Sequence, residues 1–293
     1  MAKFSGNRSN SMPTRAHPLI LQIEEELSKL KSQISSPNAS AVLVGMNGLK
    51  SLNECVDGLL RSPDTQKALL PHRKQKWVEE MLGDFIRLLD ANNVMRDALL
   101  SMKERVRALE SALRRRSGGV ESSLESKIGA FILSRKKAKK DINKCLVAVK
   151  QMCPPHPLQD GDNNLLVVIV RLLNEVRDLT IWIFHCVLLF VGQTSPKRKM
   201  SKWSLVSRSV RRNAVTCEGE QVKMSEVEVV TLSLYNISNH KSSKDIVDVE
   251  RLLEIQKKLE VLDVNIDGLE SGLEHVFRSL IQTRVSLLNT FSL

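Results

Sequence analysis

Aromatic residues, glycine and proline are all scarce in this 293-residue chain. Aromatic side chains make up 4% of the residues, and there are 13 Gly and 9 Pro. All-β folds need many turns, and turns are rich in glycine and proline, so this scarcity argues against a sandwich or a barrel. Hydrophobic residues still make up 42%. The chain can therefore bury a sizeable core, and that core is predicted to be aliphatic.

Cysteine is also rare, and its count of five is odd. No two cysteines form a C-x-x-C pair, which indicates reduced thiols in an intracellular protein. Cys153 and His156 lie three residues apart, but a closed zinc site needs four ligands and no second pair is in register. We interpret this pair as part of a Pro-rich turn and predict no metal site.

Catalytic motifs are missing as well. The sequence has no phosphate-binding G-x-x-x-x-G-K-[ST] loop, no G-x-S-x-G nucleophile motif and no H-E-x-x-H zinc helix. Each of these motifs places particular groups around a reacting atom, and no other constellation can be assigned such roles. We therefore predict a protein that is not an enzyme, takes no cofactor and has no small-molecule substrate. An enzyme would instead require a deep pocket with convergent polar groups.

Targeting and membrane signals are weak. Residues 1–17 contain no apolar stretch, and Ala2 excludes N-myristoylation. We expect a disordered tail there, in an intracellular protein of the cytoplasm or nucleus. The longest apolar run, Leu179 to Gly192, has fourteen residues, whereas a membrane span needs about 20. We predict a buried core helix with His185 as a core histidine. The competing interpretation is that 179–191 contacts a membrane.

Apolar periodicity predicts helices along nearly the whole remaining chain. We expect one elongated, all-α bundle domain over residues 18–293, with a basic loop segment at 195–218. The predicted helices cover about 18–34, 40–61, 64–70, 73–116, 120–152, 165–192, 219–238 and 243–290.

Two of these helices carry a strict heptad pattern, with apolar residues at alternating steps of three and four over 78–113 and 252–280. This is the pattern of coiled coils, so each helix needs a long partner. The two helices are natural partners for one another, and the alternative is a homodimer through 252–280. Asn92 interrupts the first pattern. It either fixes the register as a buried polar residue or marks a break in the helix.

Positive charge is concentrated in the middle of the chain. The net charge is +11, and residues 100–212 alone hold 23 Lys/Arg against 9 Asp/Glu. The sharpest cluster has five basic residues in six, and two smaller clusters accompany it. The candidate interaction residues are Arg135, Lys136, Lys137, Lys139 and Lys140, then Arg114, Arg115 and Arg116, then Lys197, Arg198 and Lys199.

Three interpretations of the main cluster compete: a solvated helix face, a docking surface for acidic protein or anionic lipid, and a nuclear-import or nucleic-acid site. No aromatic residues interleave with the basic ones, which disfavours nucleic acid as a partner.

Several segments of the chain belong together by their order and spacing. They include His17-Pro18-Leu19, Lys76-Trp77-Val78-Glu79-Glu80-Met81-Leu82, Arg87-Leu88-Leu89-Asp90, Ser134-Arg135-Lys136-Lys137-Ala138-Lys139-Lys140, Trp203-Ser204-Leu205-Val206-Ser207 and Arg278-Ser279-Leu280-Ile281-Gln282-Thr283-Arg284. Together these segments resemble one plant family, the BYPASS-like proteins of domain-of-unknown-function family 241. The resemblance extends over about residues 17–291. It implies a plant protein with no known catalytic activity and an association with root and shoot development.

Two functional hypotheses follow. The first is a helical adaptor whose basic surface binds protein partners. The second is a peripheral membrane protein held to anionic lipid by the basic clusters and by the apolar segment 179–191.

Overall fold

The computed structural model describes residues 18–33, 38–115, 121–150, 164–192, 225–239 and 247–292. These ranges are helical almost throughout and contain no strand, so the all-α prediction is confirmed. The helices are α1 Pro18–Gln33, α2 Ala39–Leu60, α3 Pro63–Leu69, the 3₁₀ turn η1 Leu70–His72, α4 Lys76–Arg115, α5 Glu121–Lys150, α6 Asn164–Gly192, α8 Glu226–Asn239 and α9 Val247–Ser292.

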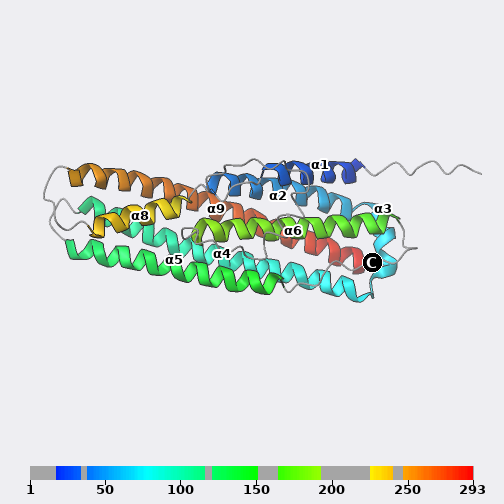
Figure 1. The fold of residues 1–293 in the computed structure, drawn as a ribbon. Coiled ribbons are helices and arrows are strands. Elements are labelled where there is room, and N and C mark those ends of the chain that lie inside the picture. The colour runs from blue at the N-terminus through cyan, green and yellow to red at the C-terminus, as the bar shows by residue number, and fades with distance from the viewer. Residues whose placement is uncertain are drawn as a thin grey trace, which may run out of the picture.

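The bundle is elongated, and its long helices run along one common direction (Figure 1). The predicted pairing of the two heptad helices is confirmed, because α4 packs against α9. The apolar pattern residues of α9 from Ile255 to Leu280 are almost fully buried within the chain. The contact between α4 and α9 therefore covers this apolar pattern within a single chain.

Asn92 lies in the middle of α4, which continues without a break from Lys76 to Arg115. Of the two interpretations of Asn92, the helix break is therefore wrong. The Asn92 side chain is 0% exposed, and its amide nitrogen and oxygen have no hydrogen-bond partner among the described residues. An unsatisfied buried amide costs stability, which agrees with the alternative of a polar residue that fixes the register of the pairing.

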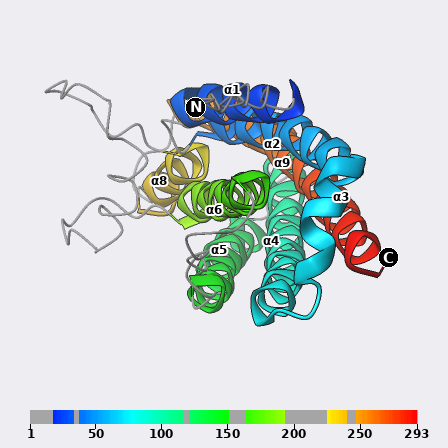
Figure 2. The same cartoon turned by 90° about the vertical axis from the view of Figure 1, so that its right-hand side faces the viewer.

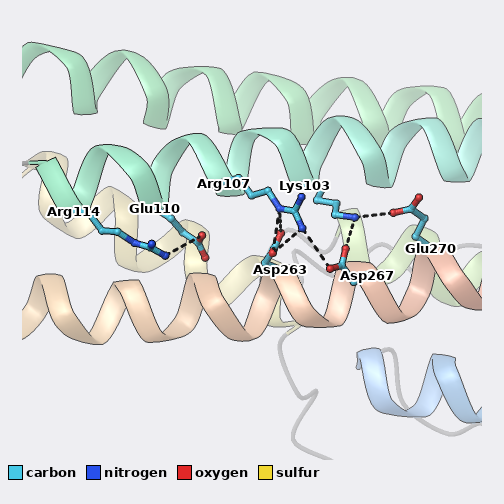
Figure 3. Close-up of polar contacts among 7 residues, drawn as sticks. All are labelled: Lys103, Arg107, Glu110, Arg114, Asp263, Asp267 and Glu270. Carbon is cyan, nitrogen blue, oxygen red and sulfur yellow. Dashed lines mark hydrogen bonds and ion pairs between the residues drawn. The ribbon is translucent and has the colours of Figure 1, made fainter.

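A row of ion pairs runs beside the apolar contact of α4 and α9 (Figure 3). Numbers rise along one helix as they fall along the other, so the helices are antiparallel. The pairs are Lys103 with Asp267 and Glu270, Arg107 with Asp263 and Asp267, and Arg96 with Glu274. Single exposed pairs contribute little, but a network with fixed spacing discriminates against a shifted register.

Two glycines on α9 allow α2 to approach closely. A Cβ atom at Gly272 would lie 2.5 Å from the sulfur of Met46, and one at Gly268 would lie 3.1 Å from a methyl carbon of Leu43. Farther along the same contact, the Ser286 hydroxyl donates to the Asp57 carboxylate. The α2 helix therefore covers a second side of α9 over much of its length.

Helix α6 occupies the centre of the bundle, as its apolar composition predicts. It contacts α1, α2, α3, α4, α5 and α8, and Figure 2 shows it surrounded by these helices in the end-on view. No residue from Leu179 to Gly192 is exposed. The prediction of a buried core helix is confirmed, and the suggestion that 179–191 contacts a membrane does not fit this burial. No described helix is long and apolar enough to cross a membrane.

Candidate functional site

The main basic cluster lies in the middle of α5, and helical geometry divides it between two sides. Lys136, Lys137 and Lys140 are exposed, Lys139 is half-buried, and Arg135 is buried with 8% exposure. The inclusion of Arg135 in an interaction surface is therefore corrected. Arg135 stands at a position where the apolar stripe of α5 would have a hydrophobic residue. Its side chain therefore points to the side of the helix that faces the core.

Arg135 joins three helices through its guanidinium group. Its Nε donates to the backbone oxygen of Val191 in α6 at 2.9 Å. Its two terminal nitrogens reach α8, where one donates to Thr231 Oγ1 at 3.0 Å and the other to the Glu228 carboxylate at 3.2 Å. The Arg135 and Glu228 side chains are 10% and 9% exposed. A buried charge needs such a complete set of partners, so this residue is structural.

Lys139 continues this contact one turn further along α5. Its Nζ donates to the backbone oxygen of Gly192 at 2.7 Å. A Cβ atom on Gly192 would lie 3.0 Å from the Lys139 methylenes, so glycine makes room for the lysine stem. Because the last carbonyls of a helix have no partner within that helix, Arg135 and Lys139 together cap the C-terminal end of α6.

The opposite side of α5 presents lysines to solvent. We call this surface the lysine face and define it by Leu133, Lys136, Lys137, Lys140, Lys144 and Val147. Among the described residues, none of the four lysines has an ion-pair partner within 4.0 Å. Leu133 is 67% exposed and Val147 is 46% exposed, one at each end. The face combines unpaired positive charge with two exposed aliphatic side chains.

The sequence-based prediction of the interaction surface did not include Lys144, Leu133 and Val147, because it followed a continuous run of basic residues. The signal that identifies them is helical spacing, because Leu133, Lys137, Lys140, Lys144 and Val147 follow one another at alternating steps of four and three. At 1.5 Å per residue this row is about 21 Å long.

The structure does not bring the smaller clusters into this face. Arg114 and Arg115 are exposed at the C-terminal end of α4, where Arg114 lies 3.8 Å from the Glu110 carboxylate. They lie at the end of α4 from which five residues lead to the start of α5 at Glu121. Arg116, Lys197, Arg198 and Lys199 lie outside the described residues, as do the predicted tail 1–17, segment 195–218 and the Cys153–His156 pair.

The described residues offer little for catalysis. They contain no group of three or more metal-binding side chains. A cavity between α4 and α6 has a volume of about 10 Å³, enough for about one water molecule. It is lined by Met81, Asp84, Phe85, Leu88, Leu173, Asn174 and Arg177.

The charged side chains beside this cavity form ion pairs with one another. Asp84 accepts from Arg177 at 3.2 Å and from Arg87 at 3.0 Å. Burial raises the pKa of Asp84, although both arginines act to lower it. Two guanidinium groups engage the carboxylate, one from Arg87 on the same helix and one from Arg177, which ties α4 to α6. We therefore interpret Asp84 as part of a structural ion pair.

The surroundings of the described cysteines disfavour the thiolate form. Burial raises the pKa of Cys186 to about 12, and burial is also the main cause of the raised pKa values of Cys55 and Cys145. Since the thiolate is the reactive form, a raised pKa lowers reactivity at neutral pH. These cysteines are therefore poor candidates for a nucleophile.

Together the fold and the surface define a class: an elongated α-helical bundle with a closed aliphatic core and an exposed basic helix face. The family model described as Protein BPS1 matches residues 45–290. The chain therefore belongs to the BPS1 family, a plant family, and the resemblance to the BYPASS-like proteins is confirmed. No curated protein and no solved structure matches the chain.

Proposed function

We propose that this protein is a non-enzymatic adaptor in plant development, and that it recruits a protein partner through the lysine face of α5. The observation that carries the proposal is the contrast in charge pairing. Basic residues beside α9 have carboxylate partners, whereas Lys136, Lys137, Lys140 and Lys144 have none among the described residues. Exposed like charges on one helix repel each other, so an acidic partner would relieve this repulsion.

The small size of the cavity between α4 and α6 agrees with the non-enzymatic part of the proposal. Its volume of about 10 Å³ is far below the volume of about 300–1,000 Å³ that is typical of substrate pockets. The link to root and shoot development is what the resemblance to the BYPASS-like proteins implies.

Peripheral binding to anionic lipid is the second candidate. Leu133 and Val147 favour it, because exposed aliphatic side chains beside lysines can enter the headgroup region of a membrane. The apolar segment 179–191 does not support it, since none of its residues is exposed. Among the described residues, lipid binding would therefore depend on exposed basic residues such as those of the lysine face.

The test is recovery of partners from plant tissue with the tagged full-length protein. The variant changes Lys136, Lys137, Lys140 and Lys144 to Glu. Its matched control changes four other exposed lysines, Lys50, Lys67, Lys74 and Lys257, to Glu. We expect the first variant to lose proteins that the control retains. Equal recovery by both variants would overturn the adaptor proposal.

A parallel flotation assay with phosphatidylserine-containing vesicles separates the second candidate. Salt-sensitive flotation of the wild type that only the first variant loses would favour lipid as the ligand, since added salt screens exposed charges.

A further inference from the structure

We propose that the lysine face binds an acidic α-helix of a partner protein, with carboxylates spaced to match the lysines. This inference rests on the adaptor function proposed above and specifies the kind of partner. It starts from spacing: the row Leu133, Lys137, Lys140, Lys144 and Val147 advances by steps of four and three. These steps place side chains along one line of a helix, which is the line that a second helix follows when it packs alongside.

A contact of this kind already exists inside the molecule, between α4 and α9. The acidic residues of α9 that meet α4 are Asp263, Asp267, Glu270 and Glu274, and they too advance by steps of four and three. Glu270 accepts from Lys103 at 3.1 Å, and the hydrogen bonds that Lys103 donates to Asp267 and Glu270 raise the pKa of Lys103. A row of carboxylates with this spacing therefore pairs with basic residues on an adjacent helix of this bundle (Figure 3).

The lysine face has the basic half of this arrangement but no acidic half. Lys137, Lys140 and Lys144 lie at the steps that three carboxylates with α9-like spacing would meet, and all three are exposed. Leu133 and Val147 extend the row at both ends and would pack against apolar residues of the incoming helix. The row requires a partner helix of about four turns, since it is about 21 Å long.

A helical partner fits this face better than a membrane does. Helices that lie on membranes bury a broad apolar side rich in Trp, Phe or Leu. The lysine face has only two aliphatic residues, separated by three lysines in the central row, and no aromatic residue. This arrangement offers little apolar area to lipid, but it offers charge at a regular spacing to a helix.

The experiment measures binding of full-length protein to two designed helical peptides. The matched peptide carries three Glu residues at the spacing of Lys137, Lys140 and Lys144, flanked by two Leu at the spacing of Leu133 and Val147. The control peptide has the same composition, with the Glu residues distributed around the helix. Fluorescence anisotropy at low and high salt reports both affinities.

We expect the matched peptide to bind about tenfold more tightly than the control peptide, because three aligned ion pairs contribute about half a kcal/mol each. The triple variant K137E/K140E/K144E loses this preference, and a matched peptide with Lys in place of Glu restores it. The variant K50E/K67E/K74E behaves as the wild type.

Equal binding of the two peptides would overturn the inference of a spaced helical partner, and so would binding to phosphatidylserine vesicles with no peptide preference. Neither result would decide the adaptor proposal, which depends on partner recovery from tissue. If the Lys-to-Glu variant fails to recover partners from tissue while the two peptides bind equally, the partner is acidic but is not a helix with this spacing. If the variant recovers the same partners as the wild type, the adaptor proposal is contradicted.

Discussion

Two helices of this bundle carry basic residues at heptad-like spacing, α4 where it meets α9 and α5 on its outer side. Lys103 and Arg107 of α4 each reach two carboxylates of α9. Lys137 and Lys140 of α5 have no such neighbours among the described residues. The residue types and spacing are alike, so the difference lies in the adjacent element. A basic cluster in a sequence does not by itself separate charge used for folding from charge available for binding.

The contrast also exists within the α5 cluster, where Arg135 is buried and Lys137 is exposed two residues later. The change Arg135→Ala should lower the free energy of unfolding by about 3 kcal/mol, because Glu228 and the end of α6 lose a buried charged partner. The change Lys137→Ala should stay within about 0.5 kcal/mol of the wild type. Urea unfolding followed by circular dichroism measures both values, and similar losses would contradict the division of the cluster.

A smaller effect is expected at the contact of α4 with α9. The change Lys103→Glu places a negative charge beside Asp267 and Glu270, and we expect a loss of about 1–2 kcal/mol. Replacing Glu270 with Lys in the same protein should restore part of the loss, because Glu270 pairs with Lys103. The corresponding change Lys140→Glu should leave stability nearly unchanged. A double-mutant cycle measures the coupling, and additive effects would show that the row does not hold the register.

The smallest effect concerns Glu110, a poorly paired carboxylate at the end of the same row. Burial and the negative charge of Asp263 raise the pKa of Glu110, while Arg114 acts in the opposite direction (Figure 3). The folded state therefore holds this proton more tightly than the unfolded state. The stability that Glu110 contributes is complete below its unfolded pKa and is lost as the pH rises through its folded pKa.

The change Glu110→Gln should therefore raise the free energy of unfolding by about 0.5 kcal/mol at neutral pH. The gain should vanish below the ordinary glutamate pKa of about 4.3. Urea midpoints of wild type and variant across this range provide the measurement. A gain that persisted in acid would show that packing rather than charge is responsible.

Helix positions could be predicted well because the apolar pattern is local. The predicted helices 73–116 and 243–290 correspond to Lys76–Arg115 and Val247–Ser292, since each pattern ends at charged, Gly-rich or polar residues. The pairing of these two helices was also predictable, because both needed a partner of similar length.

The candidate site was harder to predict, because a continuous run of basic residues does not show which of them face the core of the bundle and which face solvent. Arg135 could have been separated from its neighbours by its place in the apolar stripe. Its partner Glu228 lies 93 residues away, and no periodicity links the two. The exposure of Leu133 and the lack of partners for Lys144 also depend on how α5 sits against the bundle, which is a tertiary property.

The Arg135 contacts have a consequence for how three helices are joined. Arg135 holds Val191 of α6 on one side and Glu228 and Thr231 of α8 on the other. Both helices are therefore fastened to α5 through a single guanidinium group, so the loss of that group would release α6 and α8 from α5 at the same point.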